Sequence, residues 1–269
     1  MSCVGSGLPI QKVFQESFLP MSKTGFTHDS ATLMSLTRDV LAYARERGAT
    51  AADAEVSEGY GQTVTVRLGE VETIEYNRDK GIGVSVYLGR QRGHASTSDF
   101  STKALRDTVD AALSIARFTA ADDCAGLADA DLLAKEFPEL QLWHSWGLPV
   151  ERAIELATAC EEAAFAVDKK ITNSEGATVS TQESHFAYGN THGFLAGYPS
   201  SRHSYSCAVI AGHGEDDRDG MQRDDWYDVA RDAADLATPQ SVGKRAAERA
   251  LRRLDARKIA TTQAPVLFD

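Results

Sequence analysis

The chain has 269 residues, a formal net charge of −11, 42% hydrophobic residues and 25% charged residues. This composition is typical of a soluble globular protein that buries one large core or two modest ones. The acidic balance argues against a nucleic-acid partner, because phosphate contacts need positive charge. No segment approaches the roughly 18 consecutive apolar residues of a membrane helix. The four cysteines form no C-x-x-C pair, which favours a reducing compartment and hence the cytoplasm: Cys3, Cys124, Cys160 and Cys207.

The first part of the chain predicts a loose arm followed by a helix. Residues 1–30 show no regular apolar spacing and lack the basic start and apolar core of a signal peptide. We interpret them as an arm, with Met21 as an alternative start to Met1. Thr32–Gly48 carries apolar residues at helical spacing and ends on a glycine, so it predicts an amphipathic helix.

Residues 54–97 alternate between apolar and polar side chains, which is typical of half-buried strands. Turn signals at Gly69-Glu70 and Gly89–Gly93 interrupt the alternation, and the pattern predicts four or five antiparallel strands. Helical spacing returns in Ser101–Thr119, with Ser101 as the N-cap. We expect the helices on either side of these strands to cover their apolar face.

A long connection, residues 120–147, suggests a boundary between two domains, an N-terminal α/β domain at 31–135 and a β-rich domain at 136–269. Pro149 follows it and predicts the start of a third helix. Ile171–Tyr198 contains two Asn-to-Gly turn signals, Asn173–Gly176 and Asn190–Gly193. This segment therefore predicts a three-stranded meander.

The last part of the chain predicts one strand, two helices and a final strand. Ser204–Gly212 is apolar enough for a buried strand, while Trp226–Ala237 and Ser241–Leu254 suggest helices. The acidic stretch 215–235 predicts a solvated loop or face, and so does the basic side of the Ser241–Leu254 helix. Ala264–Phe268 carries a buried-strand signal. Together the segments predict an α+β fold, in which an antiparallel sheet flanked by helices precedes a β-rich meander with helices.

The sequence offers no recognised catalytic or metal-binding motif. Its seven histidines form neither H-E-x-x-H nor H-E-x-x-x-H, although His185, His192 and His203 could converge on neighbouring strands. Ser201 lies near His203, but no G-x-S-x-G elbow supports a serine hydrolase. We therefore expect no catalytic residue and no metal ligand in this chain. Tyr198, Arg202 and His203 are the candidates to face a peptide or a protein partner, because they border a predicted strand.

Short motifs spread over some two hundred residues resemble, in their order, the TldD/PmbA family, and in particular its PmbA (TldE) branch. That family includes the cytosolic TldD–TldE metallopeptidase, also called modulator of DNA gyrase. The motifs are Gly69–Glu75, Gly81–Tyr87, Ala95–Asp99, Ala116–Thr119, Asp123–Gly126, Lys170–Gly176, Gly189–Gly193, Gly197-Tyr198, Ser201–Ser204 and Thr238-Pro239. Asp123–Gly126 and Ser201–Ser204 resemble the PmbA branch more than the TldD branch.

The resemblance implies a non-catalytic partner half of a cytosolic peptidase that acts on small or unfolded peptides. In this family the TldD-type subunit supplies the zinc helix H-E-x-x-x-H, so zinc is expected in that partner and not in this chain. The chain ends before the places of the zinc helix and of the family's C-terminal domain, so we expect a truncated form. The alternative is a non-enzymatic interaction module or an inactive truncated product.

Overall fold

A computed structural model describes residues 25–214 and 220–268. Seven antiparallel strands form one sheet in the order β3-β2-β1-β4-β6-β7, with the short β5 paired to β4. The strands are β1 Ala51–Arg67, β2 Glu70–Leu88, β3 Gln91–Thr97, β4 Ile171–Asn190, β5 Leu195–Ala196, β6 Pro199–Ala211 and β7 Gln222–Ala230. The predicted α+β class is confirmed.

Four α-helices begin and end close to the predicted positions, because their apolar periodicity and their caps are both local signals. Asp29, Ser101 and Thr238 each accept a hydrogen bond from a backbone N–H in the first turn of the following helix, as N-caps do. Pro149 directly precedes the third helix, as expected. The helices are α1 Ser30–Glu46, α2 Thr102–Phe118, α3 Val150–Phe165 and α4 Pro239–Arg252.

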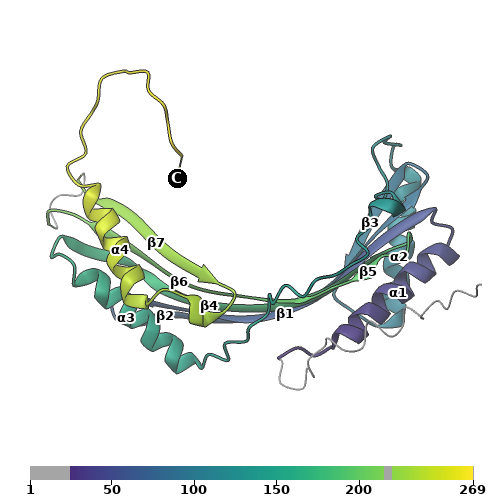
Figure 1. Cartoon of the computed structure of the whole chain (residues 1–269), viewed down its shortest axis with the longest axis horizontal. Helices are drawn as coiled ribbons and strands as arrows, with labels where there is room; N and C mark the ends of the chain where they lie inside the picture. Colours follow the sequence, from purple (N-terminus) through teal and green to yellow (C-terminus); the bar gives the residue numbers. More distant parts are fainter. Residues whose placement is uncertain (1–24, 215–219, 269) are drawn as a thin grey trace, which may run out of the picture.

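The long strands connect two separate hydrophobic clusters. Figure 1 shows a bowed sheet with α1 and α2 at one end and α3 and α4 at the other, all on its convex side. Helices α1 and α2 cover the Ala52–Val56 end of β1, and α3 and α4 cover the Val64–Val66 end. The concave side carries none of these four helices (Figure 1). We call the two sides the helix-bearing face and the helix-free face.

The strands are longer than predicted. The segment between Ala51 and Thr97 forms three strands rather than four or five, because β1 and β2 run without a break through Gly59, Gly61 and Gly81. These glycines lie within strands, and at Gly61 any added Cβ would meet the backbone of the neighbouring β4. The glycines therefore permit a close approach of strands here instead of a turn.

The predicted meander at Ile171–Tyr198 is half correct. Asn190–Gly193 does form a turn, with the Gly193 N–H donating to the Asn190 carbonyl over 3.2 Å. Asn173–Gly176 does not: the chain stays in β4, and the register against β6 shifts there, as at a β-bulge. Gly176 has φ +112°. Bulges and turns need the same residue types, so the sequence signal did not distinguish them.

Three predictions near the C-terminus are corrected. Trp226–Ala237 is not a helix: its first part belongs to β7, and a 3-10 turn follows at Ala233–Asp235. The apolar residues of this segment fit both the helical and the strand spacing. Pairing with β6 makes the segment a strand. Part of the acidic stretch is thus a strand, with residues 215–219 outside the described residues. The terminal segment is no buried strand, because Leu267 is 97% exposed.

The prediction of a loose N-terminal arm is also corrected in part. Residues 1–24, and with them Met21 as a start, lie outside the described residues. Residues 25–29 are not loose, because they lie on the sheet and bond to its side chains. The domain boundary predicted in 120–147 stays a prediction, although both hydrophobic clusters share the long strands β1 and β4.

Candidate functional site

Between the two hydrophobic clusters, the helix-bearing face of the sheet is polar. The strand register places Glu58 opposite His185, Tyr60 opposite Glu183, and Gln62 opposite Thr181. Adjacent strands put directly opposite residues on one face, so these side chains form two facing rows. The next strand, β6, adds two more residues. We call the group the polar centre: Glu58, Tyr60, Gln62, Thr181, Glu183, His185, Ser201 and His203.

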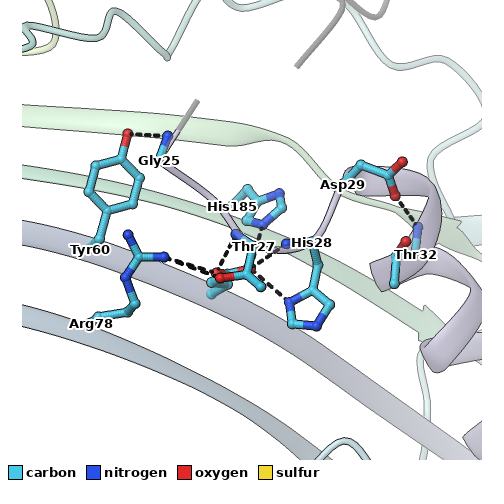
Figure 2. Close-up of polar contacts among 9 residues, drawn as sticks. Gly25, Thr27, His28, Asp29, Thr32, Tyr60, Arg78 and His185 are labelled. Atoms are coloured by element: carbon cyan, nitrogen blue, oxygen red, sulfur yellow. Dashed lines mark hydrogen bonds and ion pairs between the residues drawn. The ribbon is translucent and has the colours of Figure 1, made fainter. Parts of the chain in front are cut away.

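Glu58 binds the segment that precedes α1. One carboxylate oxygen accepts the Thr27 N–H over 2.7 Å, and the other accepts the His28 N–H over 3.0 Å. The same oxygen lies 3.0 Å from His28 Nδ1 (Figure 2). Glu58 is only 2% exposed. Burial alone would raise its pKa, but the hydrogen bonds from Thr27 and His28 outweigh burial and lower the pKa to about 2.

His185 lies beside Glu58 and under the same segment. Its ring is 1% exposed and stacks on Phe26 with a centroid distance of 4.1 Å. Its Nε2 lies 3.6 Å from a Glu58 oxygen, which is longer than a hydrogen bond, and neither ring nitrogen has a hydrogen-bond partner in the described structure. Burial lowers the pKa of His185, so its ring is neutral at pH 7.

Glu183 binds the connection between α2 and α3. Its Oε2 accepts hydrogen bonds from the Tyr60 hydroxyl and from Trp143 Nε1, both over 2.7 Å, and its Oε1 accepts one from the Ser145 hydroxyl over 2.8 Å. Burial, together with the bond to Glu183, raises the pKa of Tyr60 to about 12. The two segments 25–29 and 142–148, which lie far apart in the sequence, thus both cover the polar centre.

Ser201 and His203 also form hydrogen bonds to the connection between α2 and α3. The Ser201 N–H donates to the Leu142 carbonyl over 2.9 Å, and its hydroxyl donates to the Arg231 carbonyl over 2.7 Å. His203 Nε2 donates to the His144 carbonyl over 2.8 Å, which leaves Nδ1 to accept from the Thr181 hydroxyl. A Ser201–His203 nucleophile and base would need one of these atoms free, so the geometry does not favour a serine hydrolase.

The predicted partner-facing residues lie on opposite faces of the sheet. His203 is fully buried on the helix-bearing face. Arg202, its neighbour in β6, is exposed on the helix-free face. Tyr198 is 48% exposed and packs edge-on against Phe186 of that same face. A peptide- or partner-facing role remains a prediction for all three residues, with Tyr198 and Arg202 the accessible ones.

The three histidines that could have converged have separate partners. His185 lies under Phe26, His203 bonds to His144, and His192 Nδ1 lies 2.9 Å from the carbonyl of Ala128. Within residues 25–214 and 220–268, no group of three His, Cys, Asp or Glu residues could hold a metal ion. Sequence reasoning missed Glu58 and Glu183. Glu58 could have been found, because it continues the buried alternation of Ala54 and Val56.

The two buried cysteines and the basic side of α4 also have structural partners. Cys160 and Cys207 are buried thiols, and a hydrogen bond between them together with burial raises the pKa of Cys207. The guanidinium of Arg245 lies 3.6 Å from the ring centroid of Trp226, and Arg249 Nε bonds to Asp224 over 3.1 Å. The basic side of α4 therefore packs partly on β7 instead of being wholly solvated.

The helix-free face is polar and shallow at the end nearest α1. A depression there is lined by residues of β1, β2, β3 and β4, among them Asp53, Ser85, Arg92, His94 and Tyr188. Burial raises the pKa of Asp53, and the charge of Arg92 opposes that shift.

No helix among the described residues is long and apolar enough to cross a membrane.

Two family models match the chain. Residues 143–254 match the PmbA/TldA metallopeptidase central domain, and residues 52–116 match the PmbA/TldA metallopeptidase domain 1. Solved structures share the fold. A proposed modulator of DNA gyrase from Bacteroides thetaiotaomicron has a TM-score of 0.75 at 24% identity, over 84% of this chain and 51% of that one. TldE from Thermococcus kodakarensis has a TM-score of 0.63 at 12% identity, over 80% and 47%.

Curated relatives agree with the family models. The metalloprotease PmbA of Escherichia coli is 45% identical over 217 residues, which is 81% of this chain and 47% of that protein. A PmbA homologue of Haemophilus influenzae is 41% identical over 222 residues, which is 82% and 48%. The chain thus spans about half the length of the curated relatives it matches. Its order of motifs, its fold and these relatives agree: the chain belongs to the PmbA/TldD metallopeptidase family, in its PmbA branch.

Proposed function

We propose that the chain is part of a PmbA/TldE-type subunit that supports a TldD-type partner in a cytoplasmic peptidase acting on small or unfolded peptides. In this proposal the partner holds the catalytic zinc, and this chain supplies shape and binding surface. One observation carries it: Glu58, Glu183 and His203 of the polar centre bond to the chain's own segments 25–29 and 142–148, and Phe26 covers the ring of His185. Groups so engaged are not available to bind or attack a peptide.

The possible metal ligands among the described residues do not fit a catalytic zinc. Zinc peptidases need two histidines and a third ligand around one point, with one position open for water. His28 and His185 do flank Glu58, but Phe26 stacks on His185, and Glu58 already accepts two backbone N–H groups. No step of peptide hydrolysis is therefore assigned to residues of this chain.

The second candidate is a non-enzymatic interaction module or an inactive truncated product. The helix-free face favours an interaction module, because Tyr198 and Arg202 are accessible there. The depression that contains Asp53 and Arg92 lies on the same face. The two candidates differ in whether a zinc-containing partner binds.

The test is a reconstitution. The native protein is isolated from its source cells, co-purifying proteins are identified by mass spectrometry, and zinc is measured in each component. Hydrolysis of an unstructured peptide is then followed for the protein alone, the partner alone and the mixture. We expect zinc in the partner and faster hydrolysis by the mixture than by the partner alone. Stoichiometric zinc and hydrolysis in the protein alone would overturn the proposal, and a protein that binds no such partner would favour the alternative.

A further inference from the structure

One edge of the sheet is left open along most of β2. Strand β3 pairs with β2 only from Ile82 to Leu88. From Glu70 to Lys80, β2 pairs with β1 on its inner side, and no described strand pairs with its outer side. Every residue of this stretch is exposed. Unpaired N–H and C=O groups on such an edge can accept another strand.

The direction of the β2 backbone groups follows from the hydrogen bonds that β1 makes on its other side, toward β4. The Ala52 carbonyl accepts the Thr191 N–H from the β4 side, and the Ala52 N–H donates to the Thr191 hydroxyl. Even-numbered residues of β1 therefore point their backbone groups toward β4, and odd-numbered ones toward β2. By the register, the odd-numbered residues of β2 from Thr73 to Asp79 face β1. Ile74, Tyr76 and Arg78 thus present their N–H and C=O groups outward.

The open edge is held in place at the hairpin that begins it. The N–H groups of Leu68 and Gly69 donate to the two carboxylate oxygens of Glu161, each over 2.9 Å. Glu161 belongs to α3 and is 2% exposed. Arg67 Nε also donates to the Ser174 carbonyl of β4 over 2.9 Å. A fixed edge loses little conformational freedom on binding, so a partner strand would meet a preformed template.

The two sides of the edge differ in chemistry. On the helix-bearing side, Ile74 is 43% exposed and Tyr76 is 67% exposed, next to the buried Val64. Arg78 and Lys80 follow on the same side, but Arg78 pairs with Glu58 and Lys80 lies over the ring of Phe100. On the helix-free side, the side chains of Glu75 and Asp79 lie at the edge. A strand that pairs here must place apolar residues on one side and positive charges on the other.

We propose that the outer edge of β2, from Glu70 to Lys80, is a docking site for a strand of another protein, with apolar and basic residues in alternation. A second copy of the chain fits poorly in the register that centres on the middle of this stretch. In an antiparallel pairing centred on Asn77, Glu75 of one copy would lie opposite Asp79 of the other, and like charges directly opposite are destabilising. The inference goes beyond the peptidase role and does not depend on it.

The probe is an eight-residue peptide of alternating lysine and valine, capped at both ends and labelled with a fluorophore. Its affinity for the full chain is measured by fluorescence anisotropy, and amide hydrogen exchange is followed in residues 70–80. We expect slower exchange in this stretch when the peptide binds. A peptide with N-methyl groups on alternate amides keeps the side chains but loses main-chain hydrogen bonds, so its binding should be at least about tenfold weaker.

Variants identify the site. Ile74→Lys adds a charge on the edge and should weaken binding about tenfold, whereas Ile115→Lys changes an isoleucine of similar exposure, 47%, on α2 and should leave it unchanged. Glu75→Lys should reverse the preference toward a glutamate–valine peptide. Equal effects of the two lysine substitutions, or unchanged exchange in residues 70–80, would overturn the proposal. So would slow exchange in that stretch before any peptide is added, since the edge would then be covered already.

Discussion

The two buried glutamates of the polar centre hold their segments in different ways. Glu58 accepts two backbone N–H groups, from Thr27 and His28. Glu183 accepts only side-chain donors, from Tyr60, Trp143 and Ser145. A bond to a backbone N–H does not depend on residue type, while a bond to a side chain does. The contact of Glu58 with backbone N–H groups should therefore survive changes of the Thr27 side chain, whereas the contact of Glu183 with 142–148 requires the side chains of Trp143 and Ser145.

Both acids lie where a charge is costly unless hydrogen bonds compensate it. Glu58 is 2% exposed and Glu183 is 4% exposed. Removing the charge while keeping the shape should therefore destabilise the fold, because the donors that surround each carboxylate lose their acceptor. The substitutions below test this difference between Glu58 and Glu183, in order of decreasing expected loss of stability.

Glu183→Gln should have the largest effect, about 4 kcal/mol of unfolding free energy, because three side-chain donors converge on its two oxygens. An amide offers a single acceptor oxygen and places an NH2 group against another donor. Urea denaturation measures the loss. Glu155→Gln is the matched control, since its side chain is 63% exposed and should change stability by less than about 0.5 kcal/mol.

Glu58→Gln should cost about 3 kcal/mol at pH 7, and this cost should disappear in acid. The folded pKa of Glu58, about 2, lies below its ordinary value of 4.5. The carboxylate therefore stabilises the fold above pH 4.5, and that contribution is lost as the pH falls toward 2. Unfolding curves of both proteins at several pH values give the difference. A difference that stays constant from pH 7 to pH 2 would show that the charge of Glu58 is not what matters.

Trp143→Phe removes one donor to Glu183 and keeps most of the aromatic surface. We expect a loss of about 1–2 kcal/mol, since hydrogen bonds to charged groups contribute roughly that much. The comparison with Glu58 becomes sharper with Thr27→Val, which keeps the backbone N–H and should cost less than Trp143→Phe. If the Thr27 substitution costs more, the backbone account of the Glu58 contact is wrong.

His185→Leu should have the smallest effect, within about 1 kcal/mol of neutral, because the ring makes no hydrogen bond that would be lost. Its lowered pKa means that the folded state resists protonation of the ring. Wild-type stability should therefore fall as the pH drops below about 6.5, and the leucine variant should lose that component. Thermal unfolding between pH 7 and pH 5 tests this. A large loss at pH 7 would show that His185 makes a bond essential to the fold.

Local signals predicted the helices well and the polar centre poorly. The cap at Ser101 and the spacing of Thr32–Gly48 depend only on neighbouring residues, so they were readable. Strand β7 was mistaken for a helix because only its pairing with β6 distinguishes the two. Glu183 and Trp143 lie 40 residues apart and meet only through the fold. His203 was named as a candidate to face a peptide or a partner; its ring contacts Thr181 and His144 within the chain, and the partner-facing role stays a prediction.

Amide hydrogen exchange in Glu58→Gln and Glu183→Gln, compared with the wild type, tests most directly whether each acid holds its own segment. Conditions are chosen so that all three proteins remain folded, and exchange is read in residues 25–29 and 142–148. The account predicts faster exchange at Thr27 and His28, and not in 142–148, for Glu58→Gln, and the reverse for Glu183→Gln. Gly25 is left out of this comparison, because its N–H donates to the Tyr60 hydroxyl, which itself donates to Glu183. Faster exchange in both segments of both variants, or in neither, would contradict it.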